Sequence, residues 1–200
     1  MRLILLLALF AIFKYSQSIS LSDILKDLRD KIEELKKSQA CPESPLIPNF
    51  DLKAYLGKWY EIERITPIYE QGLKCVTAEY ADKGNGIVSV KNSGVLPFNL
   101  PLSINGEARV KNASAPNFLT VQFFKDLNTD LFQGNYHVWK TDYTKYALVY
   151  TCKTKSTETA WILSRNKTLD STTVAELKQF LNNRGVNSKK LTAVTQNCKN

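Results

Sequence analysis

The stretch YLGKWYEIERI, residues 55–65, carries the clearest fold signal in the chain. Gly57 and Trp59 stand two residues apart at the start of a run in which apolar and polar residues alternate. A period of two is typical of a β-strand with one buried face, and a glycine before it permits a tight turn. The stretch therefore predicts a first strand that follows a turn and carries a buried tryptophan. The remaining sequence indicates which kind of β-sheet contains this strand.

Short alternating runs continue as far as residue 165, with turn residues such as those of Asp82–Gly86 between them. Including the first, the eight runs read WYEIERI, CVTAEYA, GIVSVKN, LSINGEARV, NFLTVQFF, NYHVWK, YALVYTC and TAWILSR. Eight strands joined mostly by short connections favour an all-β, antiparallel up-and-down barrel, which removes exposed edges by closing on itself. Periodicity alone leaves an open two-sheet sandwich as the alternative.

Two segments carry helical periodicity instead. Residues 21–39, LSDILKDLRDKIEELKKSQ, predict an amphipathic helix with Ser20 and Asp23 placed as a capping box, and the proline-rich CPESPLIPNF then reads as a linker. In LDSTTVAELKQFLNNRGV, residues 169–186, apolar residues recur at helical spacing and Gly185 stands where a C-terminal cap is expected. We expect this second helix to lie against the outside of the barrel.

The N-terminus has the layout of a secretory signal. Arg2 precedes an apolar run from Leu3 to Phe13, and small polar residues follow before a cleavage point near Ser18 or Ser20. This run is too short to span a bilayer. We therefore expect residues 1–20 to be a signal peptide, residues 21–39 a separate helix and residues 40–200 the barrel domain of a secreted, extracellular protein.

Export also bears on the cysteines and on two N-x-S/T sequences. An even number of widely spaced cysteines in an oxidising compartment predicts two disulfides, although sequence alone leaves three pairings open. The four cysteines are Cys41, Cys75, Cys152 and Cys198. Asn112 and Asn166 are the expected glycosylation acceptors of a secreted surface.

The composition argues against nucleic-acid binding and catalysis. The formal net charge is +8, but the lysines are dispersed and lack the arginine and aromatic clusters that contact bases. His137 is the single histidine, and no nucleophile stands beside a base, so we expect no catalytic residues, no metal site and no cofactor. Glu61 and Glu63 are interpreted as the polar side of a half-exposed strand.

Three short motifs together resemble the signature regions of the lipocalins. Gly57 and Trp59 precede the first strand, Thr141-Asp142-Tyr143 separates the sixth and seventh, and Arg165 ends the eighth. Their order and separations match as well. The runs NFDLKAYLGKWYEI, TDYTKYALVYTC and AWILSRN are similar to the apolipoprotein D group, which includes insect bilin-binding lipocalins and Lazarillo-like proteins. The resemblance covers about residues 41 to 198 and implies an eight-stranded lipocalin barrel.

The resemblance also implies structural roles for these residues. Trp59 is expected to pack across the closed end of the barrel, with Arg165 over its indole in a cation–π contact. Gly57 is expected to permit the tight turn beside them. The disulfide pattern of the group pairs Cys41 with Cys152 and Cys75 with Cys198.

Strand alternation and the resemblance together suggest which side chains face the cavity. If Arg165 points inward, Trp161 does too, and if Cys152 points outward to reach Cys41, then Val149 points inward. The remaining positions rest on the resemblance alone. The residues expected to bind ligand are Tyr80, Leu119, Val121, Phe123, Tyr136, Val138, Val149 and Trp161. His137 has the opposite parity to Tyr136 and is expected to face outward.

The resemblance implies a carrier of a small hydrophobic ligand, namely a fatty acid, a steroid or retinoid, or a bilin, without enzymatic activity. Two alternatives remain: a structural or interaction protein whose barrel is filled by its own side chains, and a lipocalin-fold isomerase, which would place a free thiol in the cavity. Lys31 and Lys36 border the apolar stripe of the N-terminal helix, so like charges oppose pairing and we expect a monomer. This helix is expected to lie on an apolar surface, either its own barrel or a lipid interface, with self-association as the lesser alternative.

Overall fold

The computed structural model describes residues 20–124 and 133–198. The expected signal peptide therefore lies, apart from Ser20, outside the described residues. The chain divides into two compact units, residues 1–40 and residues 41–200.

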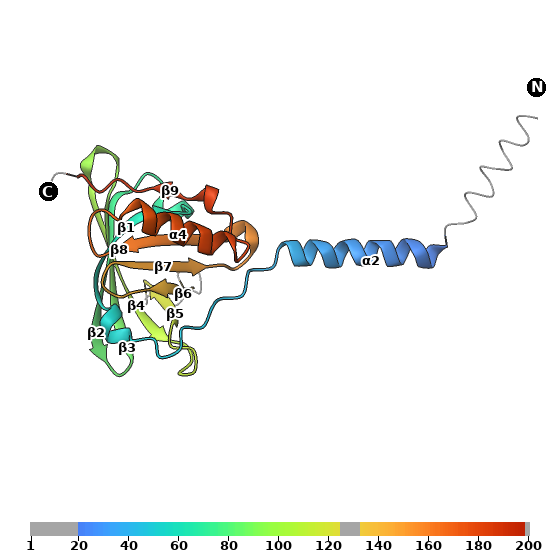
Figure 1. The fold of residues 1–200 in the computed structure, drawn as a ribbon, viewed down its shortest axis with the longest axis horizontal. Helices are drawn as coiled ribbons and strands as arrows, with labels where there is room; N and C mark the ends of the chain where they lie inside the picture. Colours follow the sequence, from blue (N-terminus) through green and yellow to red (C-terminus); the bar gives the residue numbers. More distant parts are fainter. Residues whose placement is uncertain (1–19, 125–132, 199–200) are drawn as a thin grey trace, which may run out of the picture. The chain divides into compact units, whose positions relative to one another are not determined.

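The second unit is a closed antiparallel barrel (Figure 1). Its strands are β1 (Gly57–Arg64), β2 (Lys74–Gly84), β3 (Ile87–Val95), β4 (Pro101–Val110), β5 (Phe118–Phe123), β6 (Gln133–Thr141), β7 (Tyr146–Thr151) and β8 (Thr159–Ser164). Each strand pairs with the next in sequence, and β1 pairs with both β2 and β8, which closes the sheet. The expected up-and-down barrel is thus confirmed and the open sandwich is excluded. A short ninth strand, β9 (Thr192–Ala193), adds to β1 and was not expected.

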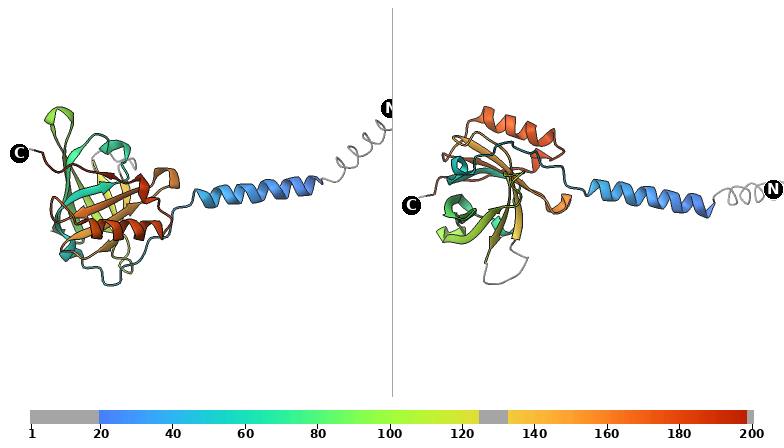
Figure 2. Two further views of the ribbon diagram at one scale, coloured as in Figure 1. Left: turned by 45° about the horizontal axis from the view of Figure 1, so that its top comes forward. Right: turned by 90° about the horizontal axis from the view of Figure 1, so that it is seen from below.

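Alternation along the strands separates two apolar clusters, one inside the barrel and one outside it. On β7, Ala147 and Val149 belong to the inner cluster with Trp59, whereas Leu148 and Tyr150 belong to the outer cluster. The expected parity of this strand is confirmed. The barrel wall is therefore apolar on both faces where α4 (Ser171–Asn182) covers it. The two views in Figure 2 show this helix, in orange-red, on the outside of the barrel.

The outer cluster explains why α4 packs where it does. Leu177 and Leu181 of the helix are buried against the β7 and β8 side chains of this cluster. After the helix, Gly185 has a φ of +76°, its N–H bonds to the carbonyl of Asn182, and the N–H of Val186 bonds to the carbonyl of Leu181. This pair of bonds is a Schellman motif, in which a glycine is favoured because its φ is positive. The expected cap is confirmed.

The closed end of the barrel is held by the three signature regions. The guanidinium of Arg165 lies 3.6 Å from the centre of the Trp59 ring, and Trp59 is fully buried. Arg165 also donates hydrogen bonds to the carbonyls of Tyr143 and Lys58. Gly57 has a φ of +92°, and a Cβ there would lie 3.3 Å from Nη1 of Arg165. The roles implied by the resemblance are therefore present in the structure.

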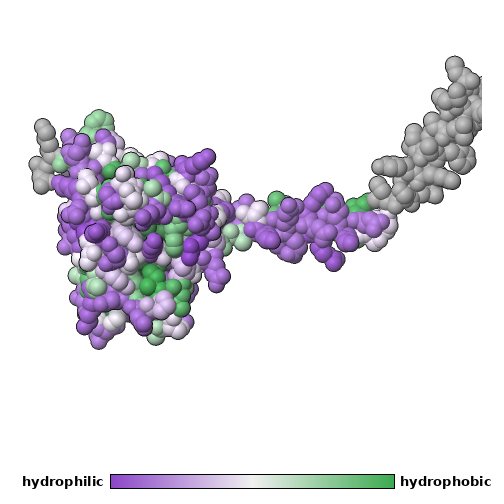
Figure 3. Space-filling view, in the orientation of Figure 1, coloured by the Kyte–Doolittle hydropathy of each residue, from purple (hydrophilic) through white to green (hydrophobic). Residues whose placement is uncertain are grey.

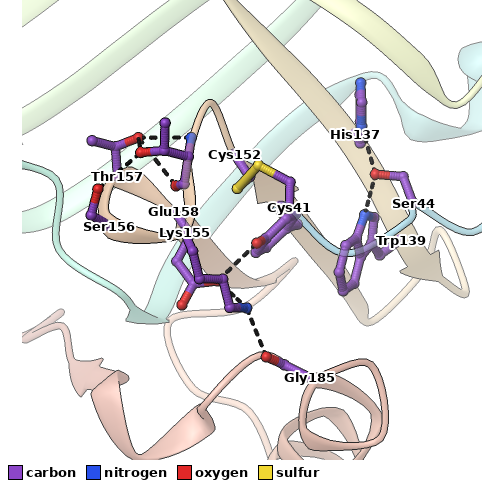
Figure 4. Close-up of a disulfide and its surroundings, with 12 residues drawn as sticks. Cys41, Ser44, His137, Trp139, Cys152, Lys155, Ser156, Thr157, Glu158 and Gly185 are labelled. Atoms are coloured by element: carbon purple, nitrogen blue, oxygen red, sulfur yellow. Dashed lines mark hydrogen bonds and ion pairs between the residues drawn. A yellow bond between two sulfur atoms is a disulfide. The ribbon is translucent and has the colours of Figure 1, made fainter. Parts of the chain in front are cut away.

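The linker before the barrel is bonded to the barrel wall. It leads to a short helix, α3 (Leu52–Tyr55). The structure contains the Cys41–Cys152 and Cys75–Cys198 disulfides, the pairing implied by the resemblance. Near the first bridge, Ser44 lies between His137 and Trp139 and hydrogen-bonds to both side chains (Figure 4). His137 therefore faces outward, as expected, and its role is to anchor the linker.

The first unit contains one described helix, α2 (Leu21–Ser38). Ser20 and Asp23 form the expected capping box at its start. In the view of Figure 3 most of the α2 surface is hydrophilic, with apolar side chains at its margin. The apolar stripe consists of Leu21, Ile24, Leu25, Leu28, Ile32 and Leu35, all of them exposed. Over the described ranges, no helix is long and apolar enough to cross a membrane.

Candidate functional site: the barrel cavity

A cavity of about 440 Å³ occupies the open half of the barrel. All eight long strands contribute to its wall, together with η1 (Ile68–Glu70), a 3-10 helix that follows β1. Apolar surface predominates in the wall, with residues such as Leu73, Val76, Val90 and Ile104. Small-molecule sites in proteins are typically apolar cavities of this size with a few polar groups. The geometry is therefore that of a binding site.

The open end has exposed apolar side chains in its loops. Two of them, Ile68 and Phe98, are 83% and 95% exposed. Ile68 belongs to η1, and Phe98 belongs to η2 (Pro97–Asn99), the 3-10 helix between β3 and β4. Both loops connect strands at the end opposite Trp59 and Arg165, so an apolar molecule would meet these side chains on its way into the cavity.

Five of the residues expected to bind ligand line this cavity: Tyr80, Val121, Phe123, Tyr136 and Trp161. Their contact with a ligand stays a prediction, but their position is the expected one.

The other three residues, Leu119, Val138 and Val149, do not line it, which corrects the expectation for them. Each faces inward and is at most 3% exposed within the inner cluster around Trp59. Alternation fixes the side of a strand that a residue faces, but not its depth in the barrel. These three side chains fill the core of the barrel instead of facing the cavity.

Three tyrosine hydroxyls form a hydrogen-bonded group, and two of these tyrosines, Tyr80 and Tyr136, line the cavity. The hydroxyl of Tyr80 donates to that of Tyr136 at 2.8 Å, and the hydroxyls of Tyr136 and Tyr55 are 2.7 Å apart. Burial raises the pKa of each of the three hydroxyls, so all of them stay protonated at neutral pH. Tyr55 was missed in the sequence because it precedes the first strand, on α3, and alternation does not apply there.

A buried ionic cluster was also missed, and its discovery corrects the interpretation of Glu61. Glu61 is 5% exposed and lines the cavity. Between Glu61 and Glu63 the register with β8 shifts, so that Glu63 instead pairs with Lys178 of α4, on the outside of the barrel. A bulge places adjacent residues of a strand on unexpected sides, and no sequence signal marks this one. The two glutamates therefore do not share a face.

Glu61 belongs to a cluster with Arg64 and Glu70. Nη1 of Arg64 donates to Oε2 of Glu61 at 2.8 Å, and Nε of Arg64 lies 3.5 Å from Oε2 of Glu70. The indole N–H of Trp161 donates to that same Glu70 oxygen at 3.1 Å. Burial is the main cause that raises the pKa of Glu61, to about 8, and the charge of Glu70 adds to it. Burial likewise raises the pKa of Glu70.

The cavity wall also contains a polar atom without a partner. Oδ1 of Asn92, on β3, is buried and has no hydrogen bond within the described part of the chain. Buried polar groups in native proteins are nearly always satisfied, so such an atom in a cavity wall is suited to a ligand. The side chains of Asn112 and Asn166 are exposed, as glycosylation acceptors must be, and their modification stays a prediction.

Comparison with known proteins gives a consistent result. A family model described as "Lipocalin-like domain" matches residues 50–196. Apolipoprotein D of Mus musculus is 39% identical over 163 residues, which cover 79% of this chain and 84% of that protein. Lazarillo protein of Schistocerca americana is 28% identical over 182 residues, which cover 82% of this chain and 78% of that protein.

Among solved structures, insecticyanin from the tobacco hornworm Manduca sexta has the same fold. Its TM-score is 0.66 at 24% identity, over 78% of this chain and 85% of that one. The resemblance drawn from the three signature motifs is confirmed by the family model and by apolipoprotein D. This chain belongs to the lipocalin family.

Proposed function

We propose that the protein is a secreted lipocalin that binds and carries one small hydrophobic molecule in its barrel. The observation that carries this proposal is the cavity of about 440 Å³, which is lined mainly by apolar side chains and opens at one end of a closed barrel. Removing apolar ligand surface from water contributes about 25 cal/mol per Å², before the losses from ordering. A ligand of steroid or retinoid size therefore gains enough to bind without any chemical step.

The structure also bears on the two alternative functions, a barrel filled by its own side chains and a lipocalin-fold isomerase. A barrel filled by its own side chains would leave no such space, whereas here filling is confined to the region around Trp59, Val138 and Val149. A thiol-dependent isomerase would need a free cysteine, but the two disulfides use all four cysteines. We therefore propose a carrier that is not an enzyme.

The candidate ligands are those implied by the family: fatty acids, steroids, retinoids and bilins. Tyr80 and Tyr136 supply hydroxyls at the wall, and Val121 and Phe123 supply apolar contact. Sparse polar groups in an apolar wall orient a ligand whose surface is mostly hydrocarbon. No bound cofactor is needed for such a role, although a bilin would fill it as a pigment.

Secretion, a monomeric state and a surface contact of α2 belong to the same proposal. Two disulfides and the signal-like residues 1–20 support export. The exposed stripe on α2 and the bordering Lys31 and Lys36 support docking on an apolar surface, either the barrel of the same chain or a lipid interface with anionic headgroups.

Native mass spectrometry of the protein, gently extracted from its source, tests the carrier function. A mass increment of a single small molecule that is lost on denaturation is the expected result. Colour in the purified sample would identify the cargo as a pigment. A protein that arrives empty and takes up none of the candidate ligand classes would refute the proposal.

A further inference from the structure

The cavity wall is acidic, although the chain as a whole is basic. Glu61 and Glu70 line the cavity, and no lysine or arginine does so among the described residues of its wall. The net charge of the whole chain is +8. The acidic side chains of the wall therefore contrast with the basic composition of the chain.

Arg64 is the nearest candidate to bind an anionic ligand, but its two terminal nitrogens already donate to neighbouring groups. Its buried Nε, which has no hydrogen bond within the described residues, lies 3.5 Å from Oε2 of Glu70. Its Nη1 bonds to Glu61, and its Nη2 donates to the carbonyls of Glu70 at 2.7 Å and Leu73 at 3.0 Å. Arg64 is 4% exposed and is not part of the cavity wall. The two glutamates therefore stand between the guanidinium and any ligand.

The charge of the cluster depends on the proton of Glu61. With both carboxylates ionised, two negative charges face one positive charge, so the cluster carries −1. Burial holds the pKa of Glu61 well above its ordinary value, so the cluster gains this charge only as the pH rises through about 8. The groups that face Glu61 are Arg64 from β1, Glu70 and Tyr69 from η1, and Tyr80 from β2.

We propose that the Glu61–Arg64–Glu70 cluster selects ligands by the charge of their polar end, so that the cavity accepts neutral alcohols or ketones and rejects carboxylate anions. The inference rests on the proposed carrier function and narrows its ligand class. A steroid or a retinol is favoured over a fatty acid or a bilin, whose ionised carboxylates would face the cluster. The rejection is strongest where Glu61 is ionised.

Groups that a neutral polar end would use are present in the same wall. The carboxyl oxygens of Glu61 lie in this wall, and the buried Oδ1 of Asn92 has no hydrogen-bond partner within the described ranges. A ligand hydroxyl can donate to either oxygen, and a ligand carbonyl can accept from Glu61 while that carboxyl keeps its proton. A carboxylate can donate to neither oxygen, and once Glu61 is ionised it can also accept nothing from Glu61 and is repelled by its charge.

Two probes with the same polyene and different polar ends test the selection. The full mature chain is titrated with all-trans-retinol and with all-trans-retinoic acid at pH 6 and pH 9, and binding is followed by quenching of tryptophan fluorescence. We expect retinol to bind similarly at both pH values. At pH 9 retinoic acid is expected to bind at least about tenfold more weakly than retinol, because one uncompensated charge a few ångströms away is worth at least that factor inside a protein.

Variants locate the effect in the cluster. Glu61→Gln removes the titrating charge and should bring the retinoic acid affinity at pH 9 close to that of retinol. Glu63→Gln is the matched control, because Glu63 lies on the same strand but outside the barrel and pairs with Lys178. Near-UV circular dichroism confirms folding. If Glu61→Gln does not fold, Glu70→Gln and the pH dependence of the natural sequence provide the same test.

The possible outcomes separate this inference from the carrier function. Equal affinities for the two probes at pH 9 would overturn the charge selection and leave the carrier function standing. A preference for retinol that Glu61→Gln and Glu70→Gln leave unchanged would overturn the role of the cluster. Binding of neither probe would overturn the selection and count against the carrier function as well.

Discussion

Trp161 contributes both apolar surface and a hydrogen-bond donor to the cavity wall. Its ring adds apolar area to the wall, while its N–H donates to the Glu70 carboxylate at 3.1 Å. An indole suits this position because it combines a large apolar body with one donor. Trp161 can therefore contact an apolar ligand through its ring and hold the Glu70 carboxylate in place through its N–H.

Replacing Trp161 by alanine is expected to weaken the binding of an apolar probe such as retinol. The lost contact with a large aromatic ring is worth on the order of a few kcal/mol. A fluorescence titration measures the affinity, and circular dichroism checks that the barrel is retained. Trp161→Phe is the matched control, since it keeps most of the apolar area and loses only the donor. An unchanged affinity in the alanine variant would show that the ring does not touch the ligand.

The raised pKa of Glu61 also predicts that the stability of the fold depends on pH. Its pKa is raised from 4.5 to about 8 in the folded protein, so the folded state holds a proton that the unfolded state releases. The stabilisation is complete below about pH 4.5 and is lost as the pH rises through about 8. One such group changes the free energy of unfolding by up to about 1.4 kcal/mol per pH unit.

Guanidinium denaturation from pH 5 to pH 9 measures this dependence. The difference between the natural sequence and Glu61→Gln isolates the contribution of Glu61 from those of His137 and the other titrating groups. Glu63→Gln should keep the slope of the natural sequence. A stability difference between the natural sequence and Glu61→Gln that stays constant with pH would mean that Glu61 is ionised throughout.

At the scale of elements, the disulfides fasten the two ends of the domain to the barrel. Cys41–Cys152 joins the linker to the end of β7, and Cys75–Cys198 joins the C-terminal segment to β2. They close loops with sequence separations of 111 and 123 residues. Cross-links over such distances remove many conformations from the unfolded chain.

Removal of either disulfide should lower the free energy of unfolding by about 2–5 kcal/mol. The two double variants are Cys41→Ala with Cys152→Ala, and Cys75→Ala with Cys198→Ala. Chemical denaturation of the two double variants measures the loss. Peptide mapping of the natural protein under nonreducing conditions is the accompanying check. A peptide that links Cys41 to Cys75 would contradict the pairing.

The apolar stripe of α2 leads to a prediction about oligomeric state and binding to lipid vesicles. We expect the mature chain and a chain that starts at Gln39 both to sediment as monomers, because Lys31 and Lys36 oppose pairing along the stripe. A dimer formed only by the longer chain would contradict this expectation. With both monomeric, flotation of only the longer chain on anionic vesicles would assign α2 to a lipid surface, and flotation of neither would contradict that assignment.

The elements were largely predictable from the sequence, and part of the site was not. The period-two runs predicted all eight long strands because each strand has two faces in different surroundings. The two-residue strand β9 carries no such period. Strand parity correctly placed Trp161 and Val149 on the inner face, but only the structure shows that Val149 lies in the filled core and not at the cavity. Likewise, only the structure shows the bulge that puts Glu61 and Glu63 on different sides of the barrel wall.

At the scale of the whole molecule, side chains fill the barrel at one end and leave a cavity at the other. Arg165, which follows β8, donates to the carbonyl of Lys58 at the start of β1, and side chains around Trp59 fill the neighbouring space. The cavity and the exposed apolar loop residues belong to the opposite end. Stability and binding therefore depend on largely different residues, so the binding site can be altered with limited effect on the fold.

The most direct test of the carrier function is a retinol titration of the mature protein beside a variant whose cavity is filled. Ala78 of β2 lines the cavity, whereas Ala81 of the same strand is exposed, so Ala78→Phe occupies the ligand space and Ala81→Phe is its matched control. We predict one bound retinol per chain for the natural sequence and for Ala81→Phe, and a loss of binding of at least about tenfold for a folded Ala78→Phe, whose ring excludes the ligand. Equal retinol binding by all three proteins would place the ligand outside the barrel and contradict the account.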